Sequence, residues 1–114
     1  MLTINTEYKE GIFYVRLKGH LNKKTVNKLY KKVSLIIQNV GITNLVFNLE
    51  NLKSIDIKGI NSLFYNYELT KSNNGYSLIV SNNKINDLLK KKRIYNYMTE
   101  ITNEMMASDI IRVR

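Results

Sequence analysis

A stretch near the middle of the chain, residues 44–67, changes its pattern from that of a strand to that of a helix. Its first part is a short apolar run of strand formers, Leu45–Leu49, and its second part repeats apolar side chains at helical spacing over residues 60–67. We therefore expect a buried strand, a crossing loop over Glu50–Gly59 and a helix that begins near Asp56–Gly59. The free N–H groups and positive dipole of a helix start make this place suited to binding.

Length and composition favour one cytoplasmic domain. The chain of 114 residues is long enough to bury a core, so residues 1–114 are expected to form a single domain. The absence of cysteine excludes disulfides, and a single histidine, His20, excludes a multi-histidine metal cluster. No apolar run approaches the roughly 20 residues of a membrane span, and the start MLTINTEYKE lacks a signal pattern. We expect no metal, no cofactor and no membrane association.

The chain is strongly basic, with a formal net charge of +9 and a pI near 9.8. The charge is concentrated in Lys23–Lys32 and Lys90–Arg93. These segments could form a nucleic-acid interface in which Tyr95 and Tyr97 stack on bases. Codon bias is the competing explanation, because the sequence is rich in Lys, Asn, Ile and Tyr, the residues of AT-rich codons. Without a nucleic-acid-binding motif, codon bias and a solvated helix face are the preferred explanations.

The first twenty residues predict a β-hairpin. Alternating apolar residues indicate strands over residues 2–6 and 13–17, with Phe13 on the buried face and Tyr14 on the polar face. Lys9–Gly11 supplies the turn between them.

A helix is expected between Asn22, a good N-cap, and Gly41, a good C-terminal stop. Its apolar stripe consists of Val26, Leu29, Val33, Ile36, Ile37 and Val40.

The last third predicts two further helices and two strands. In order, the expected elements are a turn over Lys71–Gly75, a strand over Tyr76–Val80, a helix capped within Ser81–Asn83, an edge strand over Ile94–Tyr97, and a final helix opened by Thr102 or Asn103 that carries Met105, Met106, Ile110 and Ile111. Strands that alternate with helices imply parallel neighbours, and the hairpin adds an antiparallel edge. We therefore predict an α/β fold with a mixed, mostly parallel sheet of four to five strands and about four helices.

Several segments in this order resemble the STAS domain, the fold of bacterial anti-sigma-factor antagonists. Val15–Asn22 resembles the family's strand that leads through Gly-x-Leu-(Asp/Asn) into a helix, with Thr25 where the family often has threonine. Leu45–Leu49 matches the central strand, and Ser54–Ile60 falls on the signature hydrophobic-Asp-Ser-Ser-Gly-Leu. The resemblance covers nearly the whole chain and implies a STAS-like fold.

The resemblance also implies a protein-binding surface without the usual switch. In the family the second serine of the signature is phosphorylated, and here Lys58 occupies that position and Ile57 the first. Lysine has no hydroxyl, so phosphorylation is not expected at Lys58. The nearest hydroxyls belong to Ser54 and Ser62. Either is an alternative site of phosphorylation, although serines beside a helix start are more typical of caps or surface residues. Asp56 is expected to act as an N-cap rather than in phosphotransfer.

These patterns predict a non-enzymatic protein-interaction module that resembles an anti-sigma-factor antagonist. The resemblance implies, as partner, an anti-sigma factor or serine-kinase-like regulator, or another STAS protein. The expected contact surface consists of Asp56, Ile57, Lys58, Gly59, Asn61 and Ser62. No catalytic residues are predicted, because His20 lacks an identifiable nucleophile partner in the sequence and no phosphate-binding glycine loop occurs.

Overall fold

The computed structural model describes residues 1–113, with side chains described up to residue 112. Within this range the strands form one five-stranded sheet in the order β1-β2-β3-β4-β5. They are β1 (Leu2–Lys9), β2 (Ile12–Leu21), β3 (Asn44–Ile55), β4 (Tyr76–Val80) and β5 (Thr99–Glu100). β1 pairs antiparallel with β2, and all other neighbours are parallel. The predicted mixed, mostly parallel α/β sheet is therefore confirmed.

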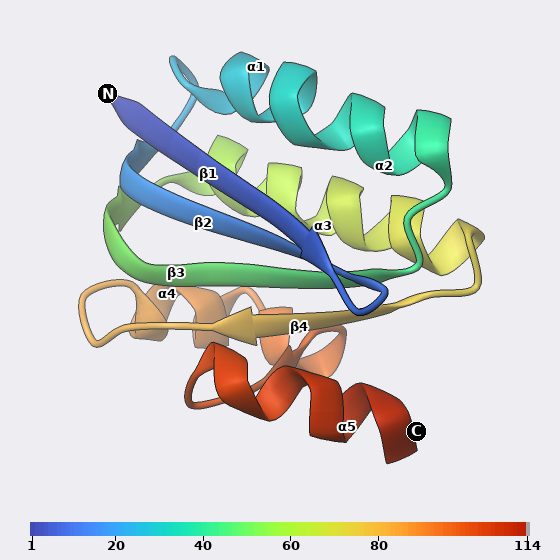
Figure 1. Cartoon of the computed structure of the whole chain (residues 1–114). Coiled ribbons are helices and arrows are strands. Elements are labelled where there is room, and N and C mark those ends of the chain that lie inside the picture. Colours follow the sequence, from blue (N-terminus) through green and yellow to red (C-terminus); the bar gives the residue numbers. More distant parts are fainter. Residues whose placement is uncertain (114) are drawn as a thin grey trace.

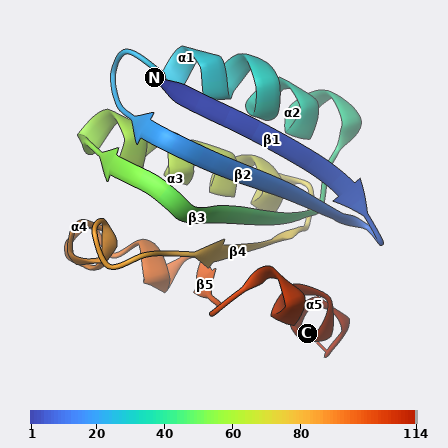
Figure 2. The same cartoon turned by 60° about the vertical axis from the view of Figure 1, so that its left-hand side comes forward.

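The helical segments are named in chain order and account for four helices in the described part of the chain. They are α1 (Val26–Leu29), η1 (Tyr30–Ser34) and α2 (Leu35–Val40), which follow one another without a break, then α3 (Ile57–Ser72), α4 (Asn86–Lys91) with the short turn η2 (Ile94–Asn96), and η3 (Glu104–Met106) leading into α5 (Ala107–Val113). Figures 1 and 2 show α1, α2 and α3 side by side along the sheet, and α5 lies on the other side of the sheet.

The sheet is covered on both faces, so there are two cores. The main core joins one face of the sheet to α1–α4, through side chains such as Phe47, Leu29 and Leu63. A smaller core joins the other face to α5, where Tyr14 packs with Ile12, Val46, Leu78, Val80, Ile101 and Ala107. The expectation that Tyr14 faces solvent is therefore wrong: α5 covers that part of the sheet and leaves Tyr14 only 5% exposed.

The predicted hairpin is confirmed. Glu10 and Gly11 form the turn between β1 and β2 with positive φ values of 53° and 77°. Two consecutive residues with positive φ match the twist of a two-residue hairpin, and glycine adopts this conformation without a steric cost.

The first helix ends at Gly41 as predicted, but it begins only at Val26, after a turn in which the Asn22 side chain accepts from the Lys24 N–H, and it buries a narrower stripe than expected. Its middle segment η1 is a π-helix, and the buried positions Leu29, Val33 and Ile37 are four residues apart. Because a π turn contains more residues than an α turn, residues four apart stay on the face of the helix that packs on the core. It turns Ile36 and Val40 outward, where they are 38% and 70% exposed, so their assignment to the stripe is wrong.

The central stretch is tighter than predicted, because β3 continues to Ile55 and only Asp56 separates it from α3. Residues 50–55 of the expected crossing are therefore strand, whereas the start of α3 at Ile57 lies within the predicted range Asp56–Gly59. Long β2 pairs with β3 along its whole length, and two register shifts, between Arg16 and Lys18 and between Gly19 and His20, keep the two strands aligned. Such bulges were hidden in the alternation pattern of either strand alone.

The predicted edge strand over Ile94–Tyr97 is also wrong. Residues 94–96 form a 3₁₀ turn, and the edge strand β5 lies at Thr99–Glu100. Arg93, with a φ of 62°, ends the preceding helical segment and turns Ile94 into the main core. The last helical segment does begin after Asn103 as predicted, but Met105 points to solvent.

Candidate partner-binding site

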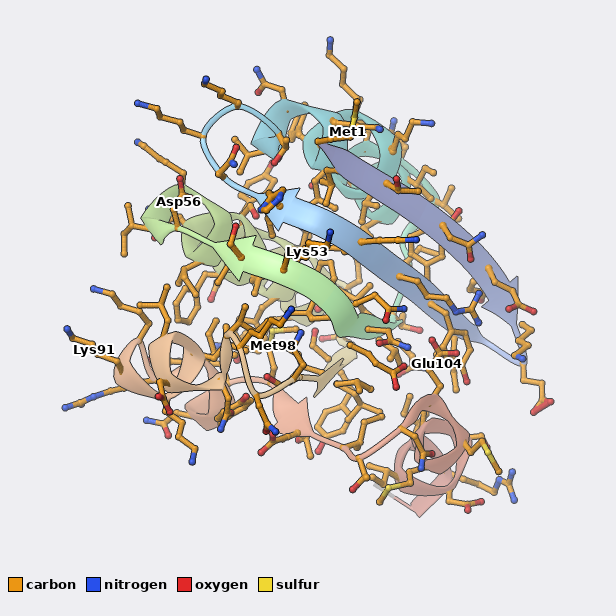
Figure 3. All side chains as sticks on the ribbon, turned by 90° about the vertical axis from the view of Figure 1, so that its left-hand side faces the viewer. Met1, Lys53, Asp56, Lys91, Met98 and Glu104 are labelled. Atoms are coloured by element: carbon orange, nitrogen blue, oxygen red, sulfur yellow. The ribbon has the colours of Figure 1, made fainter. Side chains whose placement is uncertain are left out.

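The parallel strands β2, β3 and β4 end at the same edge of the sheet, and their connections to the next helices form one surface (Figure 3). The carboxyl ends of parallel strands are the usual binding edge of open α/β sheets. Asp56 lies at the tip of β3 on this surface, and α3 starts directly after it.

Asp56 caps two segments at once. One carboxylate oxygen accepts from the Gly59 N–H at 2.9 Å, which confirms the predicted N-cap of α3. The other oxygen accepts from the Lys23 N–H at 3.1 Å, in the connection between β2 and α1. Asp56 therefore holds the start of α3 against the preceding β2–α1 connection, a tertiary role that its sequence position did not reveal.

Gly59 is required by close packing. It is buried, and a Cβ atom there would lie 2.7 Å from Cγ1 of Ile55 and closer still to the Leu21 carbonyl oxygen. A real Cβ atom cannot approach a backbone oxygen so closely, so the first turn of α3 can pack on the ends of β2 and β3 only with glycine. Close packing therefore accounts for the glycine at this position.

Ile57, Lys58 and Asn61 are the exposed members of the predicted surface. Ile57 is 47% exposed, which is unusual for an isoleucine on a helix that packs against a sheet. Lys58 makes no ion pair with any described residue and carries its charge at the positive end of the α3 dipole. Neither side chain has a structural role that explains its exposure.

The two serines differ in how their hydroxyls are used. Ser62 is half-buried, and its Oγ donates to the Gly59 carbonyl oxygen at 2.7 Å, one turn back in the same helix. Ser54 is exposed on β3 and not in a loop, and its Oγ lies 2.6 Å from Nδ1 of His20 on β2. Sequence reasoning missed this pair because it depends on the register of two strands. Thr25 secures the same corner by donating to the His20 carbonyl oxygen at 2.8 Å.

A groove of about 330 Å³ runs beside this surface, between the first helix and α3. Tyr30 and Tyr65 form its walls, with ring centroids 6.1 Å apart, and Lys58 and Asn61 stand at its rim. No local pattern of the sequence indicates this groove, because Tyr30 and Tyr65 lie on different helices.

The structure does not assemble a nucleic-acid platform from the predicted basic segments. Lys23 and Lys24 lie in the β2–α1 connection and the lysines from Lys28 to Lys32 on the first helix. Lys90–Arg93 lies at the end of α4, and α3 lies between the two segments (Figure 1). Tyr95 donates to Asn86 at 2.6 Å, and Tyr97 packs edge-on against Phe64, with ring centroids 5.4 Å apart. The two tyrosines are thus engaged in internal contacts.

A separate charged cluster fixes the C-terminal segment to the sheet (Figure 3). Arg16 on β2 donates through Nε and one Nη to both carboxylate oxygens of Glu104, each at 2.8 Å, and Asn48 donates to the same carboxylate. The hydrogen bonds from Arg16 hold the pKa of Glu104 below its ordinary value, although burial acts in the opposite direction. The same bonds raise the pKa of Arg16, with a further contribution from Glu7.

The described residues offer no candidate metal centre. No cluster of three or more histidine or acidic side chains could hold a metal ion in residues 1–113. None of the helices described is both long and apolar enough to cross a bilayer. What the surface offers is exposed isoleucine, lysine, asparagine and tyrosine side chains around a rigid helix start.

A compact α/β module with such a surface is typical of small interaction domains. Comparison with known proteins identifies the family. The sequence profile of the STAS domain family matches residues 3–94. The chain belongs to the STAS domain family.

Relatives and solved structures agree with this assignment. An anti-sigma F factor antagonist from Paenibacillus polymyxa is 26% identical over 107 residues, which cover 93% of this chain and 92% of that protein. An anti-sigma factor antagonist from Mycobacterium paratuberculosis superposes with a TM-score of 0.87 at 16% identity, over 98% of this chain and 95% of the other. The cell fate determinant SpoIIAA of Bacillus in its phosphorylated form superposes with a TM-score of 0.73 at 20% identity, over 98% and 100%.

Proposed function

We propose that this chain is a non-enzymatic bacterial protein-interaction module that works as an anti-sigma-factor antagonist does, in transcription regulation in the cytoplasm. Its partner is an anti-sigma factor or serine-kinase-like regulator, or another STAS protein. The full chain, residues 1–114, acts as one STAS domain. The relative named as an anti-sigma F factor antagonist supports the class of partner.

The observation that carries this proposal is the exposure of Ile57 and Lys58 on a rigid helix start. Asp56 and Gly59 fix the backbone there by capping and close packing. An interface with few mobile parts loses less entropy on binding. We assign contact with the partner to Ile57, Lys58 and Asn61, and assign support of the surface to Asp56, Gly59 and Ser62.

Binding through this surface does not depend on phosphorylation at the position of the family switch. Lys58 has no acceptor hydroxyl, and Ser62 commits its hydroxyl to the helix backbone. Of the two serines considered, only Ser54 is exposed, and it lies on β3 beside His20. The module is therefore active in binding as synthesised.

A binding experiment with purified proteins tests the proposal. Anti-sigma factors and STAS proteins encoded in the same genome are titrated against the full chain by calorimetry. We expect one of them to bind, and Lys58→Glu and Ile57→Asp to weaken binding at least about tenfold, or ~1.4 kcal/mol. Lys91→Glu, with the same charge change at the end of α4, is the matched control and should bind as the wild type does. Equal binding by all four proteins would refute the proposed surface.

A further inference from the structure

The groove between the first helix and α3 presents mainly apolar surface, and two hydroxyls in its lining are already bonded within the protein. The Ser34 hydroxyl in its lining donates to Asn66 at 2.8 Å, and the Ser62 hydroxyl donates to the Gly59 carbonyl oxygen. Tyr30 and Tyr65 are 41% and 43% exposed on the walls. Such a lining favours an apolar side chain, because a polar group inserted there would exchange its bonds with water for few others.

The groove is open and small, which suits one or two side chains of a bound polypeptide. Its volume of about 330 Å³ is at the low end for small-molecule sites, which usually enclose their ligand. Exposed tyrosines are typical anchors of protein interfaces, since each offers a large contact area with few rotatable bonds.

Lys58 lines the groove, and the two segments around the groove are basic. The two segments that form the groove, residues 26–34 and 57–67, contain four lysines and no acidic residue; the lysines are Lys28, Lys31, Lys32 and Lys58. Between Gly11 and Tyr67 the sequence has only two acidic residues, Glu50 and Asp56. The Asp56 carboxylate accepts hydrogen bonds from two backbone N–H groups, and Lys28 donates to the Leu2 carbonyl oxygen. The described residues show no ion pair for the other three lysines.

We propose that this groove is a second anchoring site, which binds an acidic segment of the partner protein through one large apolar side chain. The apolar side chain lies between Tyr30 and Tyr65, and an acidic side chain that flanks it faces Lys58. The inference rests on the proposed function, and Lys58 belongs to both the α3 surface and this groove. Charge complementarity of this kind selects the partner and speeds its association.

A polypeptide is preferred to a nucleic acid for two reasons. The tyrosine rings are tilted by 39° with centroids 6.1 Å apart, which leaves no parallel slot for a base. The other basic segment, Lys90–Arg93, lies on the far side of α3 and does not line the groove.

Selection of a random displayed peptide library on the full chain tests the inference. We expect the enriched peptides to be acidic and to share one large apolar residue. Their affinity should fall at least about tenfold in Tyr65→Ser and in Lys58→Glu, and should fall with added salt. Tyr8→Ser on β1 and Lys91→Glu on α4 are matched controls at exposed positions and should bind as the wild type does.

Other outcomes would overturn the inference. Enrichment of basic or neutral peptides, or equal binding by Tyr65→Ser and Tyr8→Ser, would exclude the groove as an acidic-segment site. Competition by single-stranded RNA that depends on Tyr65 would assign the groove to nucleic acid instead. A natural partner that is lost in Ile57→Asp but retained in Tyr65→Ser would refute the groove and leave the proposed function standing. Retention in both variants would refute both.

Discussion

At the scale of single residues, Asp56 shows how a local signal acquires a tertiary role. Its position before a helical pattern predicts an N-cap, and the structure confirms it. The same carboxylate also accepts from Lys23, which is distant in sequence, and so orders the β2–α1 connection. Asp56 thus supports the proposed contact residues without having to touch a partner.

Replacing this carboxylate should destabilise the fold. Asp56→Ala removes the acceptor of two backbone N–H groups, so we expect the free energy of unfolding to fall by about 1–2 kcal/mol in urea titrations. Asp56→Asn keeps a side-chain acceptor for Gly59 and should lose less. If the two variants were equally stable, the capping role would be contradicted.

Introducing a hydroxyl at position 58 should create a phosphorylation site. The backbone there has the geometry of a helix start, where the dipole and free N–H groups favour a phosphate. We expect a serine-kinase-type anti-sigma factor with ATP to add one phosphate to Lys58→Ser and none at this position in the wild type, as measured by intact-mass spectrometry.

The double variant Lys58→Ser with Ser62→Ala is the control for that experiment, because it retains the new hydroxyl and removes the neighbouring one. Loss of the phosphate in the double variant would show that the kinase modifies residue 62 and not residue 58.

At the scale of elements, the first helix shows how a π-helical segment changes which residues are buried. The π segment η1 places Leu29, Val33 and Ile37 on the core and turns Ile36 outward. Ile36 and Ile37 are adjacent, chemically identical and on the same helix, so they form a matched pair for measuring this effect.

Truncating these two isoleucines should have very different effects. Ile37 is fully buried in the main core, and Ile37→Ala should lower the free energy of unfolding by about 2–5 kcal/mol, through lost burial and a cavity. Ile36 is 38% exposed, and Ile36→Ala should cost no more than about 1 kcal/mol. Thermal or urea unfolding would measure both, and similar losses would contradict the π-helical register.

At the scale of the whole molecule, one end of the sheet is proposed to bind the partner, and one face of the sheet is covered by the C-terminal segment. The carboxyl ends of β2–β4 present the proposed contact surface, while the opposite face is covered in part by α5. The link between Glu104, Arg16 and Asn48 attaches the segment before α5 to the sheet. This link joins residues from opposite ends of the chain and therefore reports on docking of the C-terminal segment.

Stability should decrease at acidic pH through this link. The folded pKa of Glu104 lies below its ordinary value of 4.5, so the ion pair contributes stability above that pH and loses it as the pH falls through the folded pKa. Glu104→Gln should be less stable than the wild type at neutral pH, and this difference should shrink in acid. Urea unfolding across pH values measures it, with Glu68→Gln, at an exposed position of α3, as the control.

Much of the fold and the position of the candidate site could be read from local patterns. The hairpin, the strands near Leu45–Leu49 and Tyr76–Val80, the stop at Gly41 and the cap at Asp56 all depend on residues close together in sequence. Backbone preferences, periodicity and capping act over a few residues, and the sequence by itself therefore determined these features.

Tertiary contacts decided the rest. The length of β3 follows from its pairing with β2, the burial of Tyr14 from the docking of α5, and the His20–Ser54 contact from strand register. The groove exists only because the first helix and α3 pack side by side on one face of the sheet. Each of these depends on segments far apart in the chain, whose distances and register are set by packing and hydrogen bonding across the folded molecule, so no local pattern contains them.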